Sequence, residues 1–353
     1  MTVLDNPAFD DHELVTYARD PVSGLSAILA VHNTSRGPAL GGCRMWPYAS
    51  THAAETDALR LARGMTYKAA ISGLPFGGGK SVIIGDPAEH KTSDLLRAMG
   101  RAVDALCGRY TVAEDVGIGV ADVAQMAECT TWVAGMPVGE SDGDPSPATA
   151  YGVYQGMRAA VRHSLGRDEL SGLRIGVQGA GAVGDKLCAH LADEDADVLV
   201  ADVDAERARA VAARHGARTC PAEDILAAEL DILAPCALGG VIDDVSLPRL
   251  RARIIAGAAN NQLAADHHGA ALRERGILYA PDYVVNAGGV IHISHEGASY
   301  DRAHAFAHVG RIHDTLLDIF ARAERTGEPT SAAADRLAEA RFTHPNPEAF
   351  RGP

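Results

Sequence analysis

The residues best suited to chemistry are two lysines in a stretch that is otherwise apolar or rich in glycine, residues 65–84. Lys68 ends a stripe of helical spacing whose other members are small or apolar. Lys80 follows three glycines and precedes an apolar run, which predicts that it projects from the start of a strand into a crowded cleft. Two surface lysines with buried stems are the alternative. In a cleft, one lysine could anchor a carboxylate, and a lysine desolvated beside a like charge could act as a base.

Two carboxylates, Glu114 and Asp115, directly follow a short strand that we expect at residues 110–113. Gly117 comes two residues after the second of them. Carboxylates at the carboxyl end of a strand, next to a glycine, are candidates for a cleft. Turn chemistry is the open alternative for this segment.

A Gly-x-Gly-x-x-Gly pattern runs from Gly179 to Gly184 in an informative context. Apolar runs predict a strand at residues 173–177 before it and a helix after it, and a second strand at 198–201 ends on Asp202, about 20 residues beyond the first glycine. This order predicts a dinucleotide site with the pyrophosphate at the helix N-terminus, rather than a purely structural turn. Asp202 would accept hydrogen bonds from the ribose hydroxyls and repel a 2′-phosphate, which favours NAD over NADP.

The elements that position these residues alternate between strands and helices, which indicates an α/β protein. Ser50 or Thr51 can cap the helix that carries Lys68. The other elements expected in this part are a strand at residues 25–32, a glycine-rich turn at 37–42 and an amphipathic helix at 93–107.

A change in composition at residues 139–147 marks a domain boundary. Ser146 followed by Pro147 is typical of a helix cap and a first-turn proline, and it places Thr149 in a first turn whose N–H groups favour a polar ligand. Later apolar runs predict parallel strands whose carboxyl ends would line a ligand crevice. These runs are residues 231–236, 253–256 and 277–280.

The end of the chain is expected to be helical. A long amphipathic helix at residues 300–325 would close the second domain, and a last helix at 331–342 could pack back on the first. The predicted domains are residues 1–138 plus 330–353, and residues 139–329.

Composition excludes several classes of protein. With 47% hydrophobic and 22% charged residues the chain is an ordinary globular protein, and its net charge of −14 argues against nucleic acid or an anionic membrane as a partner. Neither a membrane-spanning run nor a signal peptide is expected.

The cysteines and histidines give no metal signature. Six scattered cysteines without a Cys-x-x-Cys pair indicate reduced thiols in a cytoplasmic protein. His267 and His268 are adjacent and would not share one helical face, so we interpret them as solvated. We therefore expect no metal site.

An NAD domain joined to a domain with two cleft lysines suggests hydride transfer assisted by acid–base chemistry. An ATP enzyme is the competing hypothesis, because residues 77–81 resemble the end of a phosphate-binding loop. That motif needs a glycine where this chain has Leu74, and its lysine should open a helix rather than a strand. A non-catalytic NAD-binding sensor is a third class, but it would have no use for the paired lysines.

Eight motifs together resemble the glutamate/leucine/phenylalanine/valine dehydrogenase family, most of all its leucine and valine branch. They follow one another in family order, and the similarity extends from about residue 25 to residue 290. The motifs are Leu40-Gly-Gly, Met65-Thr-Tyr-Lys68, Leu74-Pro-Phe-Gly-Gly-Gly-Lys80, Ala113-Glu-Asp115-Val-Gly, Gly179-Ala-Gly-Ala-Val-Gly184, Pro235-Cys-Ala-Leu-Gly-Gly240, Ala259-Asn-Asn261 and Pro281-Asp-Tyr-Val-Val-Asn-Ala-Gly-Gly289.

The resemblance implies reversible oxidative deamination of an L-amino acid to its 2-oxo acid and ammonia with NAD(P), and Asp202 makes NAD the expected cofactor. It implies a substrate-binding and oligomerisation domain followed by a Rossmann-type domain, with the last helix returning to the first domain. A homo-oligomer acting on small molecules is therefore expected.

Roles are carried over by motif. Lys68 would hold the substrate carboxylate, Lys80 would activate the water that attacks the imino intermediate, and Asp115 would exchange a proton with the amine. The substrate-binding set is Leu40, Gly41, Met65, Lys68, Ala113, Asn261, Val290 and Ile293. The cofactor-binding set is Thr149, Gly179, Ala180, Gly181, Ala182, Val183, Gly184, Asp202, Cys236, Ala237 and Asn260.

The side-chain pocket is expected to be apolar. Leu40 and Ile293 stand where glutamate-using relatives have a lysine and a hydroxyl, and Ala113 stands where aromatic-using relatives tend to have glycine. With Val290, these residues predict a pocket sized for valine, leucine or isoleucine. A phenylalanine dehydrogenase is the alternative within the family.

Overall fold

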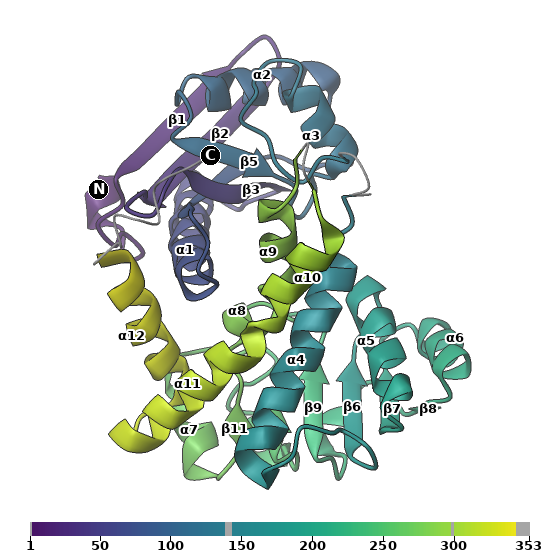
Figure 1. Ribbon diagram of the computed structural model, residues 1–353. Helices are drawn as coiled ribbons and strands as arrows, with labels where there is room; N and C mark the ends of the chain where they lie inside the picture. Colours follow the sequence, from purple (N-terminus) through teal and green to yellow (C-terminus); the bar gives the residue numbers. More distant parts are fainter. Residues whose placement is uncertain (1, 138–142, 298–299, 344–353) are drawn as a thin grey trace. The chain divides into compact units, whose positions relative to one another are not determined.

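The computed structural model describes residues 2–137, 143–297 and 300–343, and the chain divides into two compact units (Figure 1). The first unit comprises the described residues of the ranges 1–144, 293–300 and 338–353, and the second comprises those of 145–292 and 301–337. The sequence-based division instead changes domain before residue 139 and returns to the first domain at residue 330. Each unit has its own sheet, so the two are described in turn.

The first unit contains a five-stranded mixed sheet with the order β1-β2-β4-β3-β5. β1, β2 and β4 are antiparallel neighbours, whereas β3 pairs in parallel with both β4 and β5. The central strand β4 is buried over almost its whole length, as its continuous run of small and apolar residues predicts. The bounds are β1 (Leu14–Asp20), β2 (Leu25–Asn33), β3 (Ala39–Trp46), β4 (Gly77–Ile84) and β5 (Tyr110–Ala113).

Two glycine-rich segments lie inside strands, although the sequence predicted a turn for the first and the start of a strand for the second. The turn expected at residues 37–42 is wrong from Ala39 onward, because β3 begins there. Lys80 lies within β4 rather than at its start. A Cβ on Gly41 would come within 1.8 Å of the Gly79 carbonyl oxygen, so these glycines allow close approach of two paired strands rather than a change of direction.

Helices cover both faces of this sheet. The 3-10 helix η1 (Val3–Asp5) precedes β1. α1 (Thr51–Ile71) packs its alanines against β2 and β4 on one face, and the Ser50 side chain accepts a hydrogen bond from the Ala53 N–H, which confirms the predicted cap. α2 (Ser93–Asp104) and α3 (Val120–Met126) pack with Leu29, Ile83 and Tyr110 on the other face.

The second unit contains a six-stranded sheet with the order β11-β10-β9-β6-β7-β8, in which every paired neighbour is parallel. This is the doubly wound arrangement expected for a dinucleotide-binding domain, with crossover helices between the strands. The strands are β6 (Arg174–Gln178), β7 (Asp197–Ala201), β8 (Arg218–Thr219), β9 (Ile232–Pro235), β10 (Ile254–Ile255) and β11 (Leu278–Tyr279). The helices are α4 (Ser146–Leu165), α5 (Ala182–Asp193), α6 (Ala205–His215), η2 (Ile225–Ala227), η3 (Leu247–Arg249), α7 (His267–Glu274), α8 (Asp282–Val285), α9 (Gly288–Ser294), α10 (Arg302–Gly310), α11 (Ile312–Thr326) and α12 (Thr330–Thr343).

Two helix predictions need correction. The single long helix expected at residues 300–325 is two helices, α10 and α11, separated at Arg311, next to the weak helix former Gly310. Ser146 is the first helical residue rather than the cap, because Pro145 precedes α4 at that position. Among the described residues, no helix combines the length and the apolar character that crossing a bilayer requires.

The last helix contributes residues to both units. Residues 338–343 belong to the first unit, where the Tyr67 hydroxyl donates to Glu339 and the Arg36 guanidinium donates to the Arg341 carbonyl. Earlier in the helix, Asp335 accepts a hydrogen bond from the Tyr283 hydroxyl within the second unit.

Candidate active site

A largely buried ion pair joins the two residues predicted to do acid–base chemistry. Lys80 is 5% exposed, and its Nζ lies 3.0 Å from Oδ2 of Asp115 in the loop after β5. Gly42 of β3 makes this approach possible, since a Cβ there would come within 2.8 Å of the Asp115 Cβ. The sequence presented the two residues as separate candidates, and the sheet brings them into contact.

Arg44 of β3 binds the same carboxylate. Its Nε lies 2.8 Å from Asp115 Oδ2 and its Nη1 lies 3.0 Å from Asp57 Oδ2, where the Tyr48 hydroxyl also donates. Burial would raise the pKa of the Asp115 carboxyl, but the charges and hydrogen bonds of Lys80 and Arg44 outweigh it and hold this pKa below its ordinary value of 3.8. Asp115 is therefore ionised throughout the neutral range.

Sequence reasoning missed Arg44, Asp57 and Tyr48. A signal for Arg44 was available, because it is the one charged residue in a strand of eight that is otherwise apolar or glycine. Asp57 and Tyr48 gave no comparable signal, since their importance comes from contact with Arg44.

The charge that touches Lys80 differs from the expected one. A lysine that acts as a base was expected beside another positive charge. The group in contact with Nζ of Lys80 is instead the Asp115 carboxylate, and the positive charge of Arg44 contacts the same carboxylate. Nζ and the carboxylate are thus joined by one charge-assisted hydrogen bond.

The second lysine lies on α1. Lys68 is half-buried in the last turn of this helix, where the helix dipole favours a cation, and Met65 lies half-buried in the preceding turn. Gly41 is buried in β3, and its carbonyl accepts a hydrogen bond of 2.7 Å from the Tyr110 hydroxyl.

A largely apolar cavity of about 310 Å³ lies within the first unit. Leu40 and Ile293, predicted to shape the substrate pocket, both line it. Ala113 is buried elsewhere in the sheet, and Val290, half-buried, belongs to the second unit; neither lines this cavity. The remaining lining residues, which sequence reasoning missed, are Phe76, Thr111, Val133, Ala134, Gly135, Met136, Ser294, Glu296 and Gly297.

The glycine loop of the second unit has the geometry of a phosphate cradle. A Cβ on Gly184 would come within 2.0 Å of the Gly179 carbonyl oxygen, so helix and loop touch directly, and Gly179 has a φ of +107°, which favours glycine. Gly181 precedes α5 without a side-chain cap, and a Cβ there would meet no atom within 4 Å. The helix N–H groups, with Ala182 and Val183 in the first turn, are thus accessible to a pyrophosphate.

Asp202 is tied to this loop. Its side chain is 7% exposed, Oδ2 accepts a hydrogen bond of 2.7 Å from the Ala180 N–H, and Oδ1 accepts one of 2.8 Å from the Asp204 N–H. Arg207, which sequence reasoning missed, lies 3.9 Å from Asp202 and 3.3 Å from Asp204.

A cavity of about 540 Å³ adjoins Asp202 and extends to residues 219–223. Beside the glycine loop, it fits the nucleoside half of a dinucleotide. These features of the second unit therefore fit the cofactor that the fingerprint predicts.

The segments predicted to hold the nicotinamide end follow β9 and β10. Asn286, another residue that sequence reasoning missed, donates a hydrogen bond of 2.7 Å to the Asn260 side chain. Asn261 has a φ of +51°, and its carbonyl accepts from the Gly240 N–H. Thr149 lies in the first turn of α4, where its hydroxyl donates a hydrogen bond of 2.9 Å to the Pro145 carbonyl.

Cys236 and Ala237 follow β9 directly and touch the glycine loop, because a Cβ on Gly179 would lie 2.9 Å from their backbone atoms. Burial raises the pKa of the Cys236 thiol to about 11. The thiol is therefore protonated at neutral pH and is a poor nucleophile.

Comparison with known proteins places this geometry in context. Residues 12–132 match the model of the Glu/Leu/Phe/Val dehydrogenase dimerisation domain, and residues 200–326 match that of the Glutamate/Leucine/Phenylalanine/Valine dehydrogenase domain.

Individual proteins are similar over nearly the whole chain. The leucine dehydrogenase of Geobacillus stearothermophilus is 50% identical over 94% of this chain and 91% of its own length, and the valine dehydrogenase of Streptomyces virginiae is 49% identical over 94% of both. The crystal structure of L-tryptophan dehydrogenase from Nostoc punctiforme superposes with a TM-score of 0.84 at 44% identity and 97% coverage of both chains.

Proposed function

Since the chain belongs to the glutamate/leucine/phenylalanine/valine dehydrogenase family, and is therefore an amino acid dehydrogenase with a nicotinamide cofactor, we propose that it deaminates branched-chain aliphatic L-amino acids reversibly with NAD. The products are the 2-oxo acid and ammonia. The observation that carries the proposal is the largely buried Lys80–Asp115 ion pair in a unit that also contains a largely apolar cavity.

The bound nicotinamide supplies the hydride acceptor, and the residues of this chain bind the substrate and move its protons. Lys68 holds the substrate carboxylate by its charge, with the backbone at Gly41. Ionised Asp115 takes a proton from the substrate nitrogen, and Arg44 keeps that carboxylate in place.

Hydrolysis of the imino acid needs a second proton acceptor. In its neutral form Lys80 takes a proton from the attacking water while the new C–O bond forms. Asp115 then returns a proton to the nitrogen, and it takes the hydroxyl proton as the C–O double bond forms, the C–N bond breaks and ammonia leaves. The protons that Lys80 and Asp115 then hold pass to solvent, which restores both groups.

The cavity supports the proposed substrate class. Among the described residues, its lining includes Leu40, Ile293 and Met136 but no cationic residue, so the side-chain carboxylate of glutamate would be buried there without a charged partner, which costs several kcal/mol. Valine, leucine and isoleucine differ by only ~1–3 kcal/mol per methylene in such a pocket, so activity on all three is expected. An aromatic substrate is the second candidate, favoured by the likeness to a tryptophan dehydrogenase.

Asp202 supports NAD over NADP, because its carboxylate stands where a 2′-phosphate would be repelled. Arg207 could attract that phosphate, but Asp202 and Asp204 already engage its guanidinium. We further propose a cytoplasmic homo-oligomer, supported by six free cysteines and by the match of residues 12–132 to a dimerisation domain.

A substrate panel tests the proposal. The purified protein is supplied with valine, leucine, isoleucine, phenylalanine, tryptophan or glutamate and with NAD or NADP, and formation of the reduced nicotinamide is followed by absorbance. We expect the highest kcat/KM for an aliphatic substrate with NAD, and rejection of glutamate by orders of magnitude. A higher kcat/KM for an aromatic substrate would favour the second candidate, and no activity with any substrate would overturn the proposal.

A further inference from the structure

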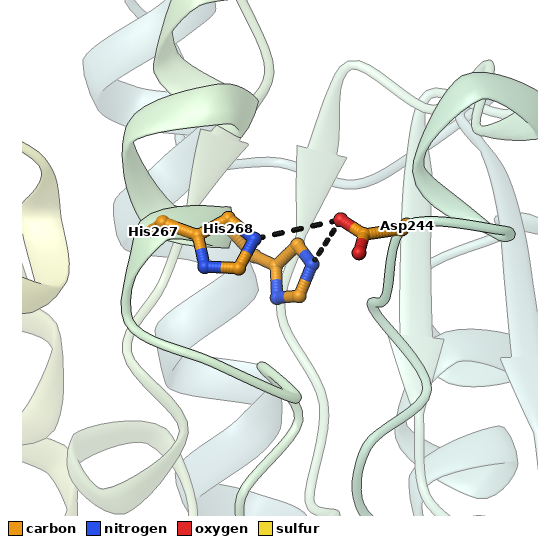
Figure 2. A group of neighbouring side chains, drawn as sticks. All are labelled: Asp244, His267 and His268. Atoms are coloured by element: carbon orange, nitrogen blue, oxygen red, sulfur yellow. Dashed lines mark hydrogen bonds and ion pairs between the residues drawn. The ribbon is translucent and has the colours of Figure 1, made fainter.

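Two adjacent histidines that the sequence presents as solvated meet an aspartate in the second unit. The rings of His267 and His268 both point toward Asp244 (Figure 2), with Nε2–Oδ1 distances of 3.4 Å and 3.1 Å. The interpretation of both as solvated is wrong for His268, whose side chain is 3% exposed. The two adjacent histidines do not need to share one face of α7 in order to contact the same carboxylate. Asp244 comes from a different segment, the loop before η3, and both rings reach it.

The backbone around these residues is ordered by hydrogen bonds. Ile242 pairs with the segment before α7, donating to the Gln262 carbonyl and accepting from the Ala264 N–H at 2.9 Å each. The neighbouring Asp243 accepts from the Val245 and Ser246 N–H groups and fixes the turn that presents Asp244. The fold therefore brings the backbone positions of the three residues close together.

The distances suit a metal ion. One ligand atom from each residue lies within 4.8 Å of the others. Tetrahedral zinc with bonds of about 2.1 Å requires ligand atoms about 3.4 Å apart, close to the two distances to Asp244. Asp244 and His267 are exposed, at 84% and 65%, so water can complete the coordination.

The surroundings of His268 also permit coordination by Nε2. Its Nδ1 lies 3.0 Å from the Ala265 nitrogen and 3.1 Å from the Ala265 oxygen. In one tautomer Nδ1 accepts from that N–H while Nε2–H donates to Asp244. In the other, Nδ1–H donates to the carbonyl and leaves the Nε2 lone pair for a metal, which is the usual outer hydrogen bond of a metal-bound histidine.

We propose that Asp244, His267 and His268 form a surface site for a divalent transition-metal ion of the zinc class. Two imidazoles and one carboxylate suit zinc, nickel or copper, whereas magnesium and calcium prefer oxygen ligands alone. The site uses none of the residues assigned to the dehydrogenase reaction.

Metal titration of the whole protein tests the site. Metal-free protein is titrated with Zn²⁺ in competition with a chromophoric chelator, and separately with Co²⁺ to record its visible spectrum. We expect one Zn²⁺ per chain, and visible Co²⁺ bands without the charge-transfer absorption that cysteine thiolates would give.

Three variants decide whether these residues bind the ion. His267→Asn and Asp244→Ala alter exposed side chains and should weaken Zn²⁺ binding at least tenfold. His215→Asn is the matched control, because His215 also pairs with an aspartate, Asp185, whose other partner is Arg214; it should bind Zn²⁺ like the wild type. Absence of stoichiometric binding, thiolate absorption with Co²⁺, or unchanged affinity in the first two variants would overturn the proposal.

Discussion

The first unit forms its candidate site from charged side chains, whereas the second unit forms its proposed cofactor site from backbone groups. Lys80 and Arg44 each lie within 3.0 Å of the Asp115 carboxylate in a largely buried network. Around Gly179 and Gly181, by contrast, the absence of side chains would let a ligand approach the N–H groups at the start of α5. Substitutions in the two units should therefore have different effects. In the first unit they should slow proton transfer, and in the second they should weaken cofactor binding.

The largest effect should come from Lys80→Ala. Loss of a general base typically lowers the rate by ~10²–10⁴, so turnover should fall by that factor. The Kd for NADH should stay near the wild-type value, because Lys80 and the glycine loop belong to different units.

Steady-state rates and fluorescence titration with NADH measure the two quantities. Lys91→Ala is the matched control, since Lys91 also pairs with a partly buried aspartate, Asp122 at 2.7 Å. A folded Lys80→Ala variant with near wild-type turnover would remove Lys80 from the mechanism.

Asp115→Asn should be nearly as severe, because an amide cannot exchange the proton. The lowered pKa of Asp115 adds an effect on stability. Its contribution is present above 3.8, the ordinary value, and is lost as the pH falls through the lower folded-state pKa.

The Tm of the wild type should therefore fall more steeply below pH 3.8 than that of Asp115→Asn, which lacks this titration. Thermal unfolding at several pH values measures the difference. An unchanged rate and pH profile in the variant would make Asp115 only a turn residue.

Gly181→Ala separates binding from folding in the second unit. Its Cβ would meet no atom within 4 Å, so the Tm of the free protein should not change. The added methyl group would stand where the pyrophosphate approaches the helix, and the Kd for NADH should rise about tenfold.

Gly184→Ala is the comparison, because its Cβ would lie 2.0 Å from the Gly179 carbonyl oxygen and should lower the Tm itself. Calorimetry and NADH titration of both variants distinguish the two outcomes. Unchanged NADH affinity in Gly181→Ala would place the pyrophosphate elsewhere.

The smallest effect is expected from Arg44→Lys. A lysine cannot contact Asp115 and Asp57 at once as the guanidinium fork does, so kcat should fall about tenfold with little change in KM. The acidic limb of the pH–rate profile should move to higher pH, because Asp115 loses part of the interaction that lowers its pKa. Arg97→Lys, at a similar but more exposed fork, is the control; an identical pH profile in Arg44→Lys would show that Arg44 does not position Asp115.

The sequence by itself determined the features that depend on local order along the chain. The fingerprint at Gly179–Gly184 and the acid at Asp202 were predictable because a strand, a loop, a helix and a second strand follow one another within a short stretch. The cap at Ser50 and the bounds of β5 were predictable because caps and apolar runs are read from neighbouring residues.

Tertiary structure alone decided what depends on contacts between distant segments. Ala39–Gly42 joins a strand because β4 and β5 lie on either side of it, which no local pattern of glycines reveals. Lys80, Asp115 and Arg44 come from three different strands or their ends, and only the pairing of those strands sets their distances. His268 is buried for the same reason: local periodicity describes one helix, whereas burial depends on the segment that packs against it.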